Sequence, residues 1–419
     1  MMQAILANKR VQAGLAFIEA DHERTISEQK EIVLIEAPTF HEEKRARDYA
    51  RRLRELGLRD VHIDEHGNAL GRRPGRGQGS WQGPVILLEA HLDTVFPFGT
   101  DVKPVEREGK IYAPGICDDT RGLAANLCVI RALDYAGIET VGDIVFAGTT
   151  REEGMGGLAG MRGLLLSHPE IAASVSIDGA GVDSIVYQAT GIRNFAVTYM
   201  GPGGHAYGAF GLPSPIHAAA RAVALLSDLR PPILPKTTFT VSLIQGGHQI
   251  HAIAEQASFK INMRSDDGAE LDKFEAEAIA AFEQGAALEN ARWGRKAVTV
   301  TYEKILDAPA GTQPRDAAIV QLAWQATEAL GITPRLEAGG CTNTNIPVSM
   351  GIPAVTLGRG GKEGGIHSLG EWFDPTGTYR CPQKSFLLLI ALAGLAGAKP
   401  SCEAMAAAVP VATGVLSEW

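Results

Sequence analysis

The sequence has few cysteines, and their spacing forms no paired motif. The five are odd in number: Cys117, Cys128, Cys341, Cys381 and Cys402. Disulfide-rich secreted domains carry denser, even sets, so this composition argues against that class. We therefore expect a reducing, cytoplasmic setting with free thiols.

Long apolar runs and an excess of basic residues are also lacking. The most apolar stretch, FLLLIALAGLAGA from Phe386, has about a dozen residues. A membrane span needs roughly 20, so this stretch predicts a buried helix and no membrane partner. The opening segment MMQAILANKR lacks the pattern of a secretory signal. The formal net charge of −9 argues against a nucleic-acid partner, because phosphate binding requires a basic face.

The length of 419 residues suggests two compact domains. Up to about residue 190, helical periodicity alternates with nearly continuous apolar strands. The expected helices cover 27–56, 120–138 and 157–168, a hairpin covers 61–71, and strands cover 84–93, 143–150 and 173–181. This alternation predicts an α/β fold with a mostly parallel sheet sandwiched by helices.

The pattern changes after Gly191. A strand at 193–201 alternates Phe195, Val197 and Tyr199 on one face. A helix (215–229), two strands (237–245 and 257–264), a long helix (268–293) and a strand (297–304) follow, which is the order of a ferredoxin-like α+β domain. The α/β pattern then resumes with a helix at 315–331, strands at 334–338 and 353–358, and a helix at 382–397. We predict one α/β domain in two parts, 1–190 and 306–419, interrupted by an inserted domain over 191–305.

Carboxylates and histidines follow several predicted strands of the α/β domain. These residues are His91, Asp93, Asp118, Asp119, Glu152, Glu153, Asp178 and, in a late glycine-rich loop, His367. In open α/β sheets, ligand sites gather outside the carboxyl ends of the strands. Imidazole and carboxylate are the ligands of divalent metals, so this set predicts a metal site with a carboxylate in reserve.

Each of these residues also has an ordinary structural interpretation. A single His91 could be a satisfied core histidine, and Asp118–Asp119 could cap the following helix. The two glutamates could be solvated turn residues, His367 could bond a backbone carbonyl, and Asp178 could end its strand in a turn. All of these would have to hold together at successive strand ends, and metal ligation explains the whole set more simply.

One competing motif is GMGGLA (154–159), which fits Gly-x-Gly-x-x-Ala after a strand and before a helix. This pattern could mark a dinucleotide site. However, Glu152 and Glu153 would lie where a pyrophosphate needs positive potential. The segment GRGGKEGG does not complete a phosphate-binding loop either.

Seven stretches together resemble one enzyme family. They are HLDTV, GICDDTRG, TTREEG, SIDGAG, GPGGHAY, INMRS and GGIHSLGEWF. The chain is similar, from about residue 27 to 397, to the co-catalytic di-zinc exopeptidases and amidohydrolases. That family includes tripeptidase T, carboxypeptidase G, aminoacylase and succinyl-diaminopimelate desuccinylase.

The resemblance implies a site with two zinc ions, although cobalt or manganese could use the same ligands. His91, Asp118 and Asp178 would hold one ion, and Asp118, Glu153 and His367 the other, with Asp118 as the bridge. The peptide bond after Asp118 would be cis, and Asp93 would orient His91. Glu152 would take a proton from a metal-bridging water and pass it to the leaving amine.

The inserted domain would serve as a lid and as the interface of a homodimer. His205 would cross from a partner subunit to stabilise the oxyanion, and Arg264 would hold a substrate carboxylate. Otherwise His205 is a loop histidine and Arg264 a surface arginine. His251 and Asn343 stand where the family often has asparagine and aspartate, and both lie near the expected substrate site.

The predicted activity is zinc-dependent hydrolysis of the amide bond of short peptides, by a di- or tripeptidase or a carboxypeptidase-like exopeptidase. An N-acyl-amino-acid amidohydrolase would use the same residues, and the motifs do not separate the two. A third hypothesis, from another class, is a non-catalytic dimeric protein that binds small molecules. It predicts eroded ligand positions, whereas every expected ligand position here is filled.

Overall fold

The computed structural model describes residues 1–77 and 82–397. The chain forms two compact units. Unit 1 comprises Met1–Ala189 with Thr312–Trp419, and unit 2 comprises Thr190–Gly311. Within the described ranges, every helix is too short or too polar to cross a membrane.

Unit 1 is built on an eight-stranded sheet with the order β1-β2-β6-β3-β7-β16-β8-β15. The strands are β1 (Arg59–Ile63), β2 (Ala69–Arg73), β3 (Val85–His91), β6 (Asp143–Thr149), β7 (Ile171–Ile177), β8 (Ser184–Ala189), β15 (Arg335–Gly340) and β16 (Ala354–Leu357). Strands β6, β3, β7 and β16 are mutually parallel, and the predicted hairpin forms the antiparallel pair β1–β2. The central strands are apolar and buried, as expected when helices cover both faces.

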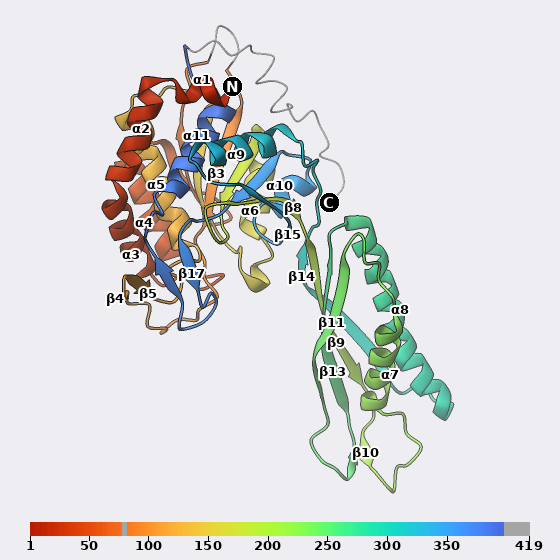
Figure 1. The fold of residues 1–419 in the computed structure, drawn as a ribbon. Helices are drawn as coiled ribbons and strands as arrows, with labels where there is room; N and C mark the ends of the chain where they lie inside the picture. Colours follow the sequence, from red (N-terminus) through yellow and green to blue (C-terminus); the bar gives the residue numbers. More distant parts are fainter. Residues whose placement is uncertain (78–81, 398–419) are drawn as a thin grey trace. The chain divides into compact units, whose positions relative to one another are not determined.

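Helices surround this sheet. They are α1 (Met2–Leu6), α2 (Lys9–Ala20), α3 (His22–Val33), α4 (Glu43–Glu55), α5 (Thr120–Tyr135), α6 (Ala159–Ser167), α9 (Ala318–Ala329), α10 (Asn345–Ser349) and α11 (Arg380–Ala393), with a short 3₁₀ turn η1 (Gly154–Gly156). Helix α5 contacts β3, α2, α3 and α11 and is buried along nearly its whole length (Figure 1). Its burial fixes the position of the loop just before it, which carries Asp118.

A second, smaller sheet of unit 1 has the order β17-β18-β5-β4 and was not predicted. Its strands are β4 (Val105–Arg107), β5 (Lys110–Tyr112), β17 (Lys362–Gly364) and β18 (Trp372–Asp374). Each has only three residues, which is too short for an alternating pattern to stand out. This sheet holds the loop between β17 and β18, on which His367 lies.

Unit 2 is a four-stranded antiparallel sheet with the order β11-β13-β9-β14, together with two helices. Its elements are β9 (Gly191–Met200), β10 (Gly204–His205), α7 (Pro215–Asp228), β11 (Thr237–Gly246), β12 (Ala252–Ile253), β13 (Gln256–Ser265), α8 (Gly268–Trp293) and β14 (Thr299–Ala308). Phe195, Val197 and Tyr199 pack into one core with α7 and α8, as their alternation predicts.

The fold class predicted from the sequence is confirmed, with one correction among the helices. The prediction of one continuous helix over 27–56 is wrong, because α3 ends at Val33 and α4 starts at Glu43. Pro38 lies between them, where its ring and missing N–H would disrupt a helix. The next turn contains Phe40 at φ 75°, in the left-handed region that ends regular structure.

Candidate active site

The predicted ligands lie where the parallel strands of unit 1 end. His91 is the last residue of β3, the two glutamates follow β6, and Asp178 follows β7. Asp118 precedes α5, and His367 lies between β17 and β18. Two overlapping groups have all their ligand atoms within 4.8 Å of one another: His91 with Asp118 and Glu153, and His91 with Glu152 and Asp178. The fold thus brings together residues that are up to 276 positions apart in sequence numbering (91 and 367).

Asp118 is the centre of this cluster. Its Oδ1 lies 2.9 Å from Nε2 of His91, and its Oδ2 lies 3.2 Å from Nε2 of His367. The same His367 nitrogen lies 2.9 Å from Oε1 of Glu153. Each oxygen of one carboxylate therefore faces a different imidazole. Such an arrangement suits a carboxylate that bridges two cations.

The ring orientation of His91 leaves the correct nitrogen for a ligand. Nδ1 lies 3.0 Å from the backbone carbonyl of Asp93, which can only accept a hydrogen bond, so Nδ1 carries the proton. Nε2 lies on the side of Asp118 and would offer its lone pair to a metal ion bound there. The Asp93 carboxylate is 3.6 Å from Nδ1, so its backbone, more than its side chain, orients this ring.

The two adjacent aspartates have separate functions. Asp119 caps α5, because its Oδ1 accepts a hydrogen bond from Gly122 N at 3.1 Å. Its Oδ2 accepts one from His91 N at 3.1 Å. The helix-cap interpretation therefore fits Asp119, whereas Asp118 faces the histidines. The peptide bond between them is cis, as the family resemblance predicts.

Buried carboxylates hold the turn that carries the two glutamates. Asp93 accepts hydrogen bonds from Glu152 N at 3.0 Å and from Glu153 N at 2.9 Å. Glu42 accepts from the preceding amide, Arg151 N, at 3.0 Å. Three consecutive N–H groups are thus fixed by two acidic side chains, which sets the direction of Glu152 and Glu153.

The electrostatics of the cluster differ from one side chain to the next. Burial raises the pKa of Glu152 well above its usual range, and the charges of Asp178 and Glu153 add to this effect. Burial likewise raises the pKa of Asp178 to about 6. Hydrogen bonds donated by His367 to the carboxylates of Asp118 and Glu153 raise the pKa of His367 to about 10. Burial therefore favours the protonated form of Glu152.

Two buried residues of the cluster were not predicted. Arg359, 3% exposed, donates from Nη1 to Oδ1 of Asp118 at 2.5 Å and to Oδ1 of Asp178 at 3.2 Å. Glu371, fully buried, accepts hydrogen bonds from the backbone of Gly115, Cys117 and Asp118 at 3.0, 2.8 and 3.2 Å. Both stand in glycine-rich stretches around His367, where the sequence predicted only a glycine-rich loop.

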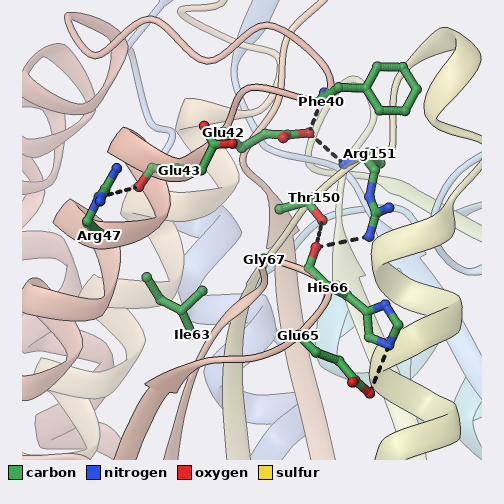
Figure 2. A pocket seen from close by; sticks show the side chains of 10 residues that line it. All are labelled: Phe40, Glu42, Glu43, Arg47, Ile63, Glu65, His66, Gly67, Thr150 and Arg151. Carbon is green, nitrogen blue, oxygen red and sulfur yellow. Dashed lines mark hydrogen bonds and ion pairs between the residues drawn. The ribbon is translucent and has the colours of Figure 1, made fainter.

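A cavity of about 450 Å³ adjoins the glutamate turn, and Figure 2 shows its walls. Its lining comprises Phe40, Glu42, Glu43, Arg47, Ile63, Glu65, His66, Gly67, Thr150 and Arg151. In Figure 2 the Glu42 carboxylate faces the amides of Phe40 and Arg151. None of the predicted site residues lines this cavity. The cavity is therefore separate from the candidate catalytic cluster.

The predicted substrate-binding residues lie in other environments. His205 is on β10 and exposed, and its Nδ1 accepts from the amides of Tyr207 and Gly208 at 3.3 and 3.1 Å. His251 is exposed and next to β12, the partner of β10. Arg264 is exposed on β13 and bonds Asn262 Oδ1 at 3.1 Å.

Asn343, in contrast, is only 1% exposed. Its amide donates to Oε2 of Glu89 at 3.0 Å and to the Thr149 hydroxyl at 2.8 Å. The structure thus places Asn343 inside unit 1, between β15 and α10, in contact with side chains of β3 and β6. A role for it in substrate binding stays a prediction.

Comparison with known proteins bears directly on this geometry. The model of peptidase family M20/M25/M40 matches residues 87–383, more than half of the chain. The chain belongs to this family. Membership in M20/M25/M40 confirms the family suggested by the seven motifs and supports the predicted class of hydrolase.

Individual relatives agree with the family match. Carboxypeptidase G2 from Pseudomonas sp. is 33% identical over 144 residues, which cover 33% of this chain and 33% of that protein. Succinyl-diaminopimelate desuccinylase from Aromatoleum aromaticum is 29% identical over 220 residues, covering 47% of this chain and 55% of that protein. The chain thus spans about a third to a half of these relatives' length.

The fold is also that of a solved family structure. Aminopeptidase PepT from Bacillus cereus superposes with a TM-score of 0.73 at 25% identity, covering 88% of this chain and 97% of that one. The α/β unit with its insertion is therefore a known M20/M25/M40 architecture.

Proposed function

We propose that this chain is a divalent-metal hydrolase that cleaves the amide bond of short peptides as an exopeptidase. One observation carries the proposal: the two oxygens of buried Asp118 face Nε2 of His91 and Nε2 of His367, with Glu153 beside His367. Glu152, next to Glu153, lies close to His91 and Asp178 and adds a further carboxylate to the cluster. The named relatives, a carboxypeptidase and a desuccinylase, both act on amide bonds.

The donor set fits divalent metal ions. Imidazole nitrogen and carboxylate oxygen are usual ligands of zinc, and the ligand atoms of His91, Asp118 and Glu153 lie within 4.8 Å of one another. Asp118, Glu153 and His367 would hold one zinc, and His91, Asp118 and Asp178 a second. Zinc supplies Lewis acidity, which polarises a carbonyl and lowers the pKa of a bound water toward about 7. Cobalt or manganese would suit the same ligands.

Glu152 acts as the general base and acid. Its raised pKa suits a group that accepts a proton from the attacking water and then donates it to the leaving amine. The hydrogen bond that the Glu152 backbone N–H donates to the Asp93 carboxylate holds the Glu152 backbone in place during this transfer. Glu153, one residue on, serves as a ligand, so the adjacent glutamates have different tasks.

Unit 2 supplies the substrate contacts, as a lid. Arg264 would hold a substrate carboxylate through its guanidinium fork, and His205 would stabilise the developing oxyanion. Nδ1 of His205 accepts two backbone hydrogen bonds, so Nε2 carries the proton and can donate it. His251, near His205, and the buried Asn343 would tune the choice of substrate.

The positions of His205 and Arg264 favour a homodimer. Arg264 pairs with Ile192 at one end of the β9–β13 ladder, whereas His205 follows the other end, where Gln256 pairs with Met200. Eight residues of strand separate these ends by ~26 Å. One copy of unit 2 therefore cannot place both side chains on one substrate, and a second copy would provide His205. Strand β11, at the sheet edge with Leu243 and Ile244 half exposed, offers a surface for pairing.

An N-acyl-amino-acid amidohydrolase is the second candidate, favoured by the similarity to a desuccinylase. The two activities share a catalytic cluster and differ in the group that precedes the cleaved bond. We also propose a cytoplasmic location, which suits the buried thiols of Cys117, Cys128 and Cys381.

A substrate screen tests the proposal. The zinc-loaded protein would meet one pool of dipeptides, tripeptides and N-acyl amino acids, followed by mass spectrometry with and without a chelator. Chelator-sensitive loss of peptides supports the exopeptidase, and loss of N-acyl amino acids alone supports the amidohydrolase. If nothing is consumed, the protein is better explained as a non-catalytic binding protein.

Glu152→Gln is the matched control for this screen. It keeps the ligands and the size of the side chain but removes the proton acceptor. We expect unchanged zinc content and loss of turnover by two or more orders of magnitude. Activity close to that of the unmodified protein would contradict the role given to Glu152.

A further inference from the structure

Arg359 brings a permanent positive charge into the candidate metal cluster. Its Nη1 lies 2.5 Å from Oδ1 of Asp118 and 3.2 Å from Oδ1 of Asp178. These are carboxylates of the same half of the cluster, the half that also contains His91. A guanidinium does not lose its proton in proteins, so this charge persists at any working pH.

The arginine is fixed in this place by its surroundings. Its backbone N–H donates to Gly179 O at 2.8 Å, and its carbonyl accepts from Nε of Arg121 at 3.3 Å. Its Nη2 donates to Oε1 of Glu363 at 3.0 Å, and its side chain is 4% exposed. A route to solvent would require breaking these contacts, because water reaches almost none of the side chain.

The other half of the cluster has a different neighbour. Oδ2 of Asp118 faces His367, whose ring also contacts Glu153. Nη1 of Arg359 is directed at Oδ1 and occupies lone pairs that a metal beside His91 would use. A cation entering that half must displace an N–H donor or tolerate a like charge at close range, where burial limits screening by solvent.

We propose that Arg359 makes the two metal positions unequal. The position formed by Asp118, Glu153 and His367 binds its ion tightly, and the position formed by His91, Asp118 and Asp178 binds a second ion at least tenfold more weakly. Arg359 is thus a positioning residue that sets metal occupancy. The inference rests on the proposed metal-dependent function and specifies how its site fills.

Metal stoichiometry tests this directly and requires no substrate. Full-length protein is stripped with a chelator and titrated with Zn²⁺ by calorimetry, and the zinc retained after desalting is measured by mass spectrometry. We expect one retained equivalent per chain and a weaker second equivalent. In Arg359→Gln the second equivalent should strengthen at least tenfold, whereas in the matched control Arg359→Lys, which keeps a charge, it should stay weak.

Two further variants keep the test valid if Arg359→Gln does not fold. In the presence of Arg359, Asp178→Asn should leave the tight equivalent unchanged, and His367→Ala should abolish it. The inference is overturned if Asp178→Asn removes the tight equivalent, if the unmodified protein binds two equal ions, or if the lysine and glutamine variants behave alike. Protein that retains no zinc at all would instead overturn the proposed function itself.

Discussion

Removal of the Glu371 side chain should damage the site without touching any predicted ligand. This buried carboxylate accepts three backbone hydrogen bonds, from Gly115, Cys117 and Asp118. Glu371→Ala leaves three buried N–H groups without a partner, at about 1–3 kcal/mol each. Relief of the carboxylate's own desolvation offsets part of this cost, since burial raises the pKa of Glu371. We expect a net loss of ~3–6 kcal/mol, a large share of a typical folding stability.

The isosteric variant separates the hydrogen bonds from the charge. In Glu371→Gln, one oxygen still accepts from Cys117 and Asp118, while the amide group replaces the oxygen that faced Gly115. The cost should therefore fall to ~1–3 kcal/mol. Because the same bonds hold the backbone of Asp118, zinc affinity should fall in the same order, alanine more than glutamine.

Thermal unfolding of the metal-free protein and zinc titration measure the two effects. At ~2 °C per kcal/mol, the alanine variant should lose ~6–12 °C in Tm. Exposed Glu277, on α8, provides a control, and Glu277→Ala should stay within about 1 °C. If Glu371→Ala matched that control in both Tm and zinc affinity, the carboxylate would not hold the Asp118 loop, and the reasoning would be refuted.

Three other outcomes are expected. Glu42→Gln should retain near-normal turnover, because the side-chain oxygen still accepts a hydrogen bond from the Arg151 amide. Glu42→Leu removes this acceptor and should lower kcat more than it raises KM. Equal kinetics for the two variants would contradict this role of Glu42. Burial lowers the pKa of Lys384 to about 8 from 10.5, so the unfolded chain binds more protons between these values and stability should rise with pH across that window, by ~3 kcal/mol. In Lys384→Met, unfolding measured from pH 7.5 to 10 should lack this rise. Removal of metal with a chelator should abolish turnover, and added Zn²⁺ should restore it; chelator-resistant turnover would exclude a metal mechanism.

The sequence was sufficient to predict site residues and buried faces where polar or apolar residues occupy regular places relative to the strands. His91, Glu153 and Asp178 lie at or just after the ends of strands that are mostly apolar, so their convergence at one sheet edge could be predicted. The alternation of Phe195, Val197 and Tyr199 likewise defined the buried face of β9. Periodicity failed around Pro38, where a turn separates α3 from α4.

Residues that act through the backbone could not be predicted in this way. Glu42 and Glu371 accept amide hydrogen bonds from segments 109 and 256 residues away, and such contacts leave no spacing in the chain. Arg359 stands among glycines that indicated only a loop, yet it is 3% exposed. The effect of a buried arginine can be judged only once its partners are known, and these lie before α5, after β7 and within β17.

The two ends of unit 2, Thr190 and Gly311, determine whether this unit could be removed from the chain without disturbing unit 1. Within unit 1, Gln313 Nε2 donates to Tyr187 O at 3.0 Å, so the places where the chain leaves and re-enters unit 1 lie close together. Within unit 2, Ile192 pairs directly with Ala308. Each unit thus closes on itself, and a few glycine and serine residues could replace Thr190–Gly311 without stretching the chain. The proposed metal-binding cluster and the proposed contacts of Arg264 and His205 with substrate would therefore lie in separable units, and a different insertion could be grafted onto unit 1.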